Sequence, residues 1–158
     1  MTAGLFPEEN VNDIFFSRHD TDALLGSASV HPFALDGKTW LTVEHYYQAM
    51  LFDNERLQSQ ILIQPTAKAA TEFTKWRFLQ KKQGWKKLRQ VLMTRAVYTK
   101  CKNYPEVAQA LLETEDKILV ENSAYDYFWG CGRDRRANNT YGKVMMNVRA
   151  KLIAEADE

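Results

Sequence analysis

The chain has 158 residues, and its 21 lysines and arginines against 20 aspartates and glutamates give a formal net charge of +1. This length suits one domain with a core of its own. The composition of 45% hydrophobic and 26% charged residues is typical of a folded globule. The small net charge excludes a strong overall attraction to nucleic acid or to an anionic membrane, so any affinity for phosphate must be local.

The two cysteines, Cys101 and Cys131, do not form a CxxC pair, so they indicate neither a zinc site nor a disulfide framework. The N-terminal residues show no signal-peptide pattern, and no window approaches the ~20 apolar residues that a membrane helix requires. We therefore expect a cytoplasmic protein with no metal, no cofactor and no membrane partner.

The first structural signals in chain order are those of a β element. Residues 1–12 are polar and contain a glycine and a proline, which predicts a flexible arm ahead of a single domain over residues 13–154. A short strand is expected at residues 14–16. Residues 33–40 alternate and contain Asp36-Gly37, which predicts a hairpin because this pair tolerates the positive φ angles of a tight turn.

Helical periodicity begins after the hairpin. Thr42 is the expected N-cap of a first helix, whose apolar face would hold Val43, Tyr46, Tyr47, Met50 and Leu51. Pro65 suits the first turn of a second helix that runs to about Thr74.

Further helices are expected later in the chain. A third would place Trp85, Leu88, Val91, Leu92 and Ala96 on one face, and Pro105 would open a fourth. Residues 118–120 suggest a short strand, and residues 121–138 a long loop of the kind that is usually functional or disordered. A last helix follows a cap at Asn139 or Thr140, with Tyr141, Val144, Met145, Val148 and Leu152 as its stripe. The predicted class is mainly α with a small β element (α+β).

Two separated stretches carry the chemistry, and the first is residues 42–49 on the first predicted helix. Helical spacing puts Glu44 and Gln48 on one side, next to Tyr47 at the edge of the apolar stripe. Desolvation there can raise the pKa of a carboxyl toward the range that is useful for proton transfer. The alternative is that Glu44 is only a first-turn acid favoured by the helix dipole.

The second stretch, residues 126–132, sets Asp126 among aromatic residues and glycines. Trp129 beside Gly130 and Gly132 suits a wall against a planar base, because glycine allows close backbone approach. The alternative is that Trp129 belongs to the core. A Rossmann loop is rejected, since the third glycine of that fingerprint is absent.

Basic residues form two groups. Arg133, Arg135, Arg136 and Lys143 lie around the start of the last predicted helix, where backbone N–H groups add to their attraction for phosphate. A solvated basic loop is an equally good interpretation. The run from Lys81 to Arg89 is interpreted as an exposed helix entrance.

Taken together, these stretches resemble the NADAR (YbiA-like) family of N-glycosidases. The similarity covers nearly the whole chain, from about Asp13 to Leu152. The matched positions are Asp36-Gly37, Trp40, Glu44-His45-Tyr46, Gln48-Ala49, Phe52, Trp85, Thr114, Leu119, Glu121, Asp126, Trp129-Gly130, Gly132, Asn139, Gly142, Met146 and Arg149.

The resemblance implies hydrolysis of an N-ribosyl bond in a phosphorylated riboside of a planar heterocycle. In some members the substrate is a ribosylaminopyrimidine phosphate of riboflavin biosynthesis, and in others ADP-ribosylated guanine. Glu44 would activate water or stabilise the sugar cation, and Asp126 would orient the ribose or act as the second acid or base; the two roles are interchangeable. The expected substrate-binding residues are Tyr47, Gln48, Trp85, Trp129, Gly130, Gly132, Arg133, Arg136 and Asn139.

Three positions depart from the family pattern. The family has Ser-Asn where this chain has Gly26-Ser27, a lysine in place of Leu51, and an acidic residue in place of Cys131. The missing lysine favours an alternative function, a non-catalytic module that binds ADP-ribose or a nucleotide. A third possibility, an N-glycosidase acting on ADP-ribosylated nucleic acid, predicts salt-sensitive binding through the arginine loop.

Overall fold

In the computed structural model, which describes residues 12–158, the chain folds into six α-helices and two small sheets. Helices dominate, so the predicted α+β class is confirmed. The arm predicted at the N-terminus, apart from Asn12, lies outside the described residues.

Both sheets have two strands. β1 (Ile14–Phe16) pairs in parallel with β4 (Leu119–Glu121), which joins the two ends of the domain. β2 (Phe33–Leu35) and β3 (Lys38–Trp40) pair antiparallel, as predicted. Asp36 and Gly37 have φ angles of 52° and 81°, so the hairpin turn uses the left-handed conformations that this pair tolerates.

Three short helices follow the hairpin. α1 (Val43–Met50) begins as predicted, because Thr42 accepts a hydrogen bond from the backbone of His45. α2 (Glu55–Leu62) was not predicted, although Asn54 caps it. α3 (Ala67–Thr74) is capped by Thr66, so the prediction that Pro65 lies in its first turn is wrong: Pro65 precedes the cap.

The second half of the chain supplies the longest helices. A 3-10 turn, η1 (Phe78–Gln80), leads to α4 (Trp85–Asn103) and α5 (Pro105–Leu112), and α6 (Thr140–Ala156) closes the fold. The predicted inner face of α4 is partly wrong, because Leu88 and Val91 are 41% and 56% exposed. The residues buried along α4 are Met93, Ala96, Val97, Lys100 and Cys101.

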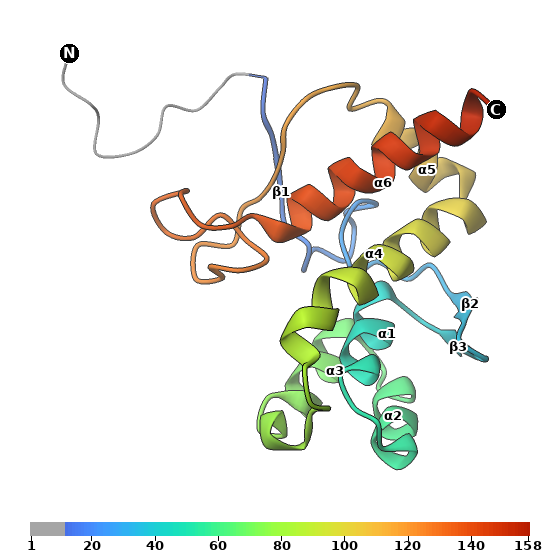
Figure 1. The fold of residues 1–158 in the computed structure, drawn as a ribbon, viewed down its shortest axis with the longest axis vertical. Coiled ribbons are helices and arrows are strands. Elements are labelled where there is room, and N and C mark those ends of the chain that lie inside the picture. The colour runs from blue at the N-terminus through green and yellow to red at the C-terminus, as the bar shows by residue number, and fades with distance from the viewer. Residues whose placement is uncertain (1–11) are drawn as a thin grey trace.

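α1 lies at the centre of the molecule. It contacts α2, α3 and α4, while α4 also packs against α6 and α5. Figure 1 shows α6 and the loop before it above α4, with α1, α2 and α3 grouped below. Seven of the eight residues of α1 are buried, from Val43 to Ala49, so its polar side chains must find partners inside the protein.

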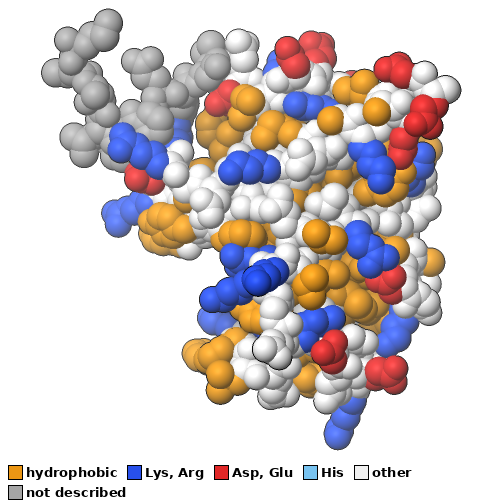
Figure 2. Space-filling view, viewed as in Figure 1, with side chains coloured by type: hydrophobic (Ala, Val, Ile, Leu, Met, Phe, Trp, Pro, Cys, Tyr) orange, Lys and Arg blue, Asp and Glu red, His pale blue; other side chains and the backbone are white. Residues whose placement is uncertain are grey.

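Charge is distributed locally on the surface. On the face shown in Figure 2, acidic side chains gather near the C-terminal end of α6, and basic ones are spread among apolar side chains elsewhere. The near-zero net charge is therefore an average over acidic and basic parts of the surface.

No helix among the described residues is long and apolar enough to cross a membrane.

Candidate active site

Glu44 is the only carboxylate of α1, and both of its oxygens accept hydrogen bonds. Its side chain is 1% exposed, and one oxygen accepts bonds from Gln48 Nε2 at 2.8 Å and Thr71 Oγ1 at 3.3 Å. The other oxygen accepts from Arg18 Nη1 at 2.7 Å and Ser27 Oγ at 2.8 Å. These four donors come from four segments of the chain, so tertiary structure fixes the position of this carboxylate.

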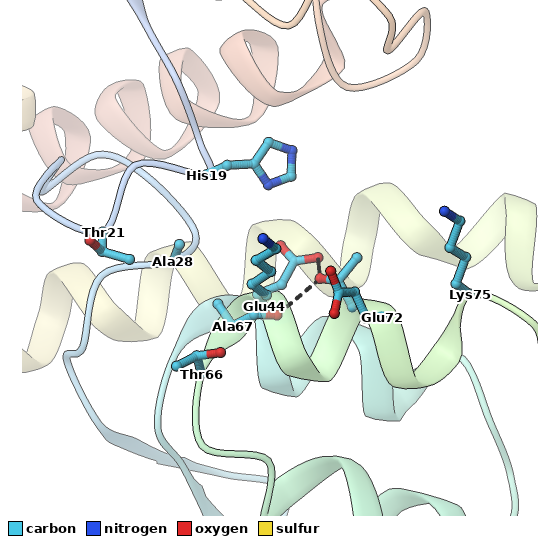
Figure 3. A pocket seen from close by; sticks show the side chains of 10 residues that line it. His19, Thr21, Ala28, Glu44, Thr66, Ala67, Glu72 and Lys75 are labelled. Atoms are coloured by element: carbon cyan, nitrogen blue, oxygen red, sulfur yellow. Dashed lines mark hydrogen bonds between the residues drawn. The ribbon is translucent and has the colours of Figure 1, made fainter.

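A pocket of about 730 Å³ opens beside Glu44. Figure 3 shows the segment that carries His19, Thr21 and Ala28 on one side and α3 on the other, with Glu44 between them. The α3 side is lined by Thr66, Ala67, Lys68, Thr71, Glu72 and Lys75. This volume falls in the usual range for small-molecule sites, and Lys68 and Lys75 bring positive charge to its wall.

Arg18 joins the two carboxylates that the sequence singles out. Its guanidinium binds Glu44, and its Nη2 lies 3.8 Å from Asp126 Oδ2. The residue is 5% exposed, and its Nε is buried with no hydrogen-bond partner among residues 12–158. Its backbone N–H donates to Glu121 Oε1 at 3.0 Å, which fixes the chain as it leaves β1.

The electrostatics of the pair favour ionised Glu44. Burial alone would raise the pKa of this carboxyl, but the Arg18 charge and the hydrogen bonds from Gln48 and Ser27 outweigh it, so the pKa is lowered. Burial opposes the charge on Arg18 too, but Glu44 and Asp126 outweigh it and raise its pKa. At neutral pH the site therefore holds a fixed carboxylate and a fixed guanidinium.

Asp126 organises the loop between β4 and α6. Its Oδ1 accepts hydrogen bonds from the backbone N–H groups of Phe128 at 3.0 Å and Trp129 at 2.8 Å, an Asx turn. The other oxygen, on a side chain that is 27% exposed, faces Arg18. One oxygen of Asp126 thus stabilises the loop backbone, and the other faces Arg18.

The aromatic residues near Asp126 pack on one another. Trp129 is 5% exposed and makes edge contacts with Tyr47, at 5.3 Å between ring centroids, and with Phe128, at 4.7 Å. The Arg18 guanidinium lies 5.8 Å from the Trp129 ring centroid. Trp129 is therefore packed against Tyr47, Phe128 and Arg18. Burial also raises the pKa of Tyr47.

Three other predicted binding residues support the loop. A Cβ on Gly130 would lie 2.7 Å from Glu121 Oε2, and Gly132 has a φ of 73°, so both positions require glycine. The Asn139 side chain donates to the Leu119 carbonyl at 2.9 Å and accepts from the Glu121 backbone at 2.8 Å. It thereby connects β4 to the start of α6.

Of the remaining predicted residues, Arg133, Arg136 and Trp85 do not bind Glu44, whereas Gln48 does. Arg133 and Arg136 are exposed on the loop and do not line the pocket. Trp85 is partly buried at the start of α4, where Lys81 Nζ lies 4.0 Å from the centroid of its ring. Gln48 binds Glu44 and accepts from Thr74 Oγ1 at 2.7 Å, so both ends of its amide are engaged.

The three departures from the family pattern have different consequences. Ser27 binds Glu44 and also accepts the Glu44 backbone N–H at 3.0 Å, so this departure supplies a site ligand. Leu51 is 1% exposed and packs in the core. Cys131 is buried in the loop, and its backbone donates to the Glu121 carbonyl at 2.8 Å.

Sequence reasoning did not identify Arg18 or Thr71 as site residues, and it noted Ser27 only as a departure from the family pattern. Arg18 and Glu44 are 26 positions apart, and Arg18 stands in a polar segment without a recognisable motif. The parallel pairing of β1 with β4 and the bond from the Arg18 backbone to Glu121 position this segment, and neither can be read from a local motif. One local clue exists, because a buried carboxylate requires a cation or several donors.

A buried carboxylate with fixed donors beside a pocket is an arrangement that many enzyme active sites share, as do some structural ion-pair networks. No group of three or more histidine, cysteine, aspartate or glutamate side chains in residues 12–158 could hold a metal ion. The groups that the described residues place around Glu44 are carboxylates, hydroxyls, an amide and cations.

Comparisons with known proteins identify the family. The NADAR domain model matches residues 5–153, so the chain belongs to the NADAR domain family. The N-glycosidase YbiA of Escherichia coli is 29% identical over 141 residues, which cover 89% of this chain and 88% of that protein. An N-glycosidase of Nostoc punctiforme is 33% identical over 127 residues, covering 78% and 81%.

Structure and naming of the relatives agree. The NMR structure of the E. coli protein YbiA superimposes with a TM-score of 0.82 at 29% identity, covering 92% of this chain and 87% of that one. The riboflavin biosynthesis protein PYRR of Zea mays is 34% identical over 125 residues, which are 73% of this chain and 20% of that protein. The chain is an enzyme of the N-glycosidase class, and the family assignment made from the sequence is confirmed.

Proposed function

We propose that this protein hydrolyses the N-ribosyl bond of a phosphorylated riboside of a planar heterocycle, with Glu44 as the catalytic carboxylate. The observation that carries the proposal is the Glu44 side chain, buried beside a pocket and held by donors from Arg18, Ser27, Gln48 and Thr71. Because its orientation is fixed before substrate binds, little reorganisation is needed when positive charge develops on the sugar.

The lowered pKa of Glu44 selects among its possible roles. Cleavage of an N-ribosyl bond passes through a cation-like state at C1′, which a nearby carboxylate stabilises. A carboxyl whose pKa is lowered by Arg18 is ionised at neutral pH and is a poor proton donor. Glu44 therefore stabilises the cation and orients the attacking water, and protonation of the departing base falls to another group.

Asp126 is the second carboxylate of the proposal. Its Oδ1 is engaged by the loop backbone, while its Oδ2 faces Arg18 across 3.8 Å. In this arrangement Asp126 orients a ribose hydroxyl, or relays a proton, on the side of Arg18 away from the Glu44 bond. Trp129, Tyr47 and the glycine-containing loop provide the wall behind these groups.

The polar lining of the pocket suits the rest of such a substrate. Lys68 and Lys75 suit a phosphate, and the Thr66 and Thr71 side chains suit ribose hydroxyls. The name of the maize relative supports a ribosylaminopyrimidine phosphate as the first substrate to test. ADP-ribosylated guanine shares the phosphorylated riboside and the planar base, so it is the second.

The decisive experiment incubates the purified protein with each substrate and follows the release of base and sugar by mass spectrometry. We expect release from at least one substrate, and Glu44→Gln should lower turnover by about 10²- to 10³-fold, as removal of one preorganised electrostatic group commonly does. A Glu44→Gln protein that folds and retains full turnover would show that Glu44 is not the catalytic group.

Two controls accompany this substitution. Glu55→Gln removes an exposed carboxylate at the start of α2, away from the pocket, and should leave turnover unchanged. Because Glu44→Gln leaves the buried Arg18 without its anion, its thermal unfolding must be recorded, and turnover measured well below its Tm. Absence of release from both substrates by the wild-type protein would contradict the proposed substrate class.

A further inference from the structure

Lys100, on α4, is a buried cation outside the pocket. It is 2% exposed, and its Nζ donates to the Leu24 carbonyl at 2.7 Å, the Gly26 carbonyl at 2.9 Å and Ser29 Oγ at 2.6 Å. No ion pair of Lys100 occurs among residues 12–158. A buried ammonium is costly without an anion, and here three neutral oxygens take the place of one.

The three acceptors belong to one irregular segment, residues 24–29, which forms neither helix nor strand. Its conformation is therefore set by contacts with other elements. The Leu25 carbonyl accepts from Tyr141 Oη at 2.6 Å, and the Arg18 carbonyl accepts from the backbone of Ser27 at 2.9 Å. Lys100 thus holds the segment at three points.

Two of these points, Gly26 and Ser29, lie immediately on either side of Ser27 and Ala28. Ser27 binds Glu44 through both its hydroxyl and its carbonyl, and Ala28 lines the pocket. A shift of residues 26–29 would thus move a Glu44 ligand and the pocket wall together.

We propose that Lys100 is a positioning residue of the active site, which holds residues 24–29 so that Ser27 stays bonded to Glu44. The inference rests on the proposed function for the catalytic role of Glu44, but the contact chain from Lys100 to Ser27 to Glu44 does not. Lys100 touches no substrate in this arrangement, and it acts through the position of a neutral side chain.

The chain of contacts predicts a change at Glu44 itself. The Ser27 hydrogen bond is one of the causes that lower the pKa of Glu44, so loosening Ser27 should move that pKa upward. The other groups near this carboxyl are Arg18, His19, His45, Tyr47, Gln48, Lys68, Thr71, Glu72, Lys75, Asp126 and Tyr141. All of them remain in a variant of Lys100.

The test compares Lys100→Met with Ser27→Ala and the double variant. The Glu44 carboxyl is titrated by 13C NMR, and kcat and KM are measured over the same pH range. We expect the Glu44 pKa to rise in Lys100→Met, and kcat to fall about ten- to a hundredfold, the usual effect of a small displacement in an active site. In the Ser27→Ala background, Lys100→Met should add little, because both changes break the same connection.

The matched control is Lys102→Met, an exposed lysine on α4 that pairs with Glu155 and should leave both readouts unchanged. A folded Lys100→Met protein with an unshifted Glu44 titration overturns the inference. If Lys100→Met does not fold, Lys100→Gln replaces it under the same criterion, because the glutamine amide ends one bond short of Nζ and has only two N–H donors for the three acceptors. The NMR readout separates the two proposals. A shifted Glu44 pKa in Lys100→Met together with full turnover in Glu44→Gln would refute only the catalytic role of Glu44.

Discussion

At the scale of single residues, the buried pair of Arg18 and Glu44 explains much of the site. Ion pairs of this kind contribute little net stability, since desolvation offsets the attraction, yet loss of one partner costs about 3–5 kcal/mol. The pair is more informative about chemistry: it keeps one carboxylate ionised and places a guanidinium within reach of a second. The protein thereby retains two buried charges of opposite sign beside the pocket.

Asp126 offers a residue-scale prediction, because its two oxygens have different partners. Asp126→Asn keeps an oxygen that can accept from Phe128 and Trp129 but removes the negative charge beside Arg18. We expect a change of less than about 1 kcal/mol in unfolding free energy, and a loss of turnover of about tenfold or more. Urea unfolding and steady-state kinetics measure the two effects.

The comparison variant is Asp126→Ala, which also removes the acceptor of the two backbone N–H groups. It should destabilise the fold by about 1–3 kcal/mol, since those donors lose their partner. If Asp126→Asn matched the wild type in turnover, Asp126 would serve the loop alone and Glu44 would be the only working carboxylate.

At the scale of elements, the sequence predicted turns, caps and helices that depend on neighbouring residues, but it did not predict contacts between distant segments. The hairpin follows from Asp36-Gly37, and α1 from Thr42 and a regular apolar stripe. The α4 face was misjudged because Leu88 and Val91 fit the same helical period but face solvent. Glu44 and Asp126 were found because each stands in a local motif, whereas Arg18 and Lys100 act on residues that only the fold brings near.

Asn139 gives a prediction about the junction of β4 and α6. Its side chain makes two hydrogen bonds to the backbone of β4, and its own φ is 49°. Asn139→Ala should therefore destabilise the protein by about 1–3 kcal/mol, whereas Asn138→Ala, at an exposed neighbour, should not. Calorimetric unfolding gives these values. A rise in KM without loss of stability would instead favour the direct substrate contact suggested by the family resemblance.

At the scale of the whole molecule, the charged site depends on segments from both halves of the chain. β1 and β4 pair in parallel, and this pairing holds Arg18 above α1 while the loop after β4 supplies Asp126. Residues 24–29, α3 and α4 complete the surroundings of Glu44. Stability and the protonation of Glu44 are consequently linked, and pH provides a test of that linkage.

The pKa of Glu44 is lower in the folded protein than its ordinary value of 4.5, so the unfolded chain binds its proton more readily. Glu44 thus contributes stability that is fully present above about pH 4.5 and is lost as the pH falls through the lower folded pKa.

The Glu44→Gln variant has no such titration. We expect it to be less stable than the wild type at pH 7, where Arg18 lacks its anion, and the gap to narrow steadily as the pH falls below 4.5. Urea unfolding of both proteins at pH 7, 5, 4 and 3 measures the gap. A gap that stayed constant over this range would mean that the pKa of Glu44 is the same in the folded and unfolded protein, which would contradict the lowering of that pKa by Arg18.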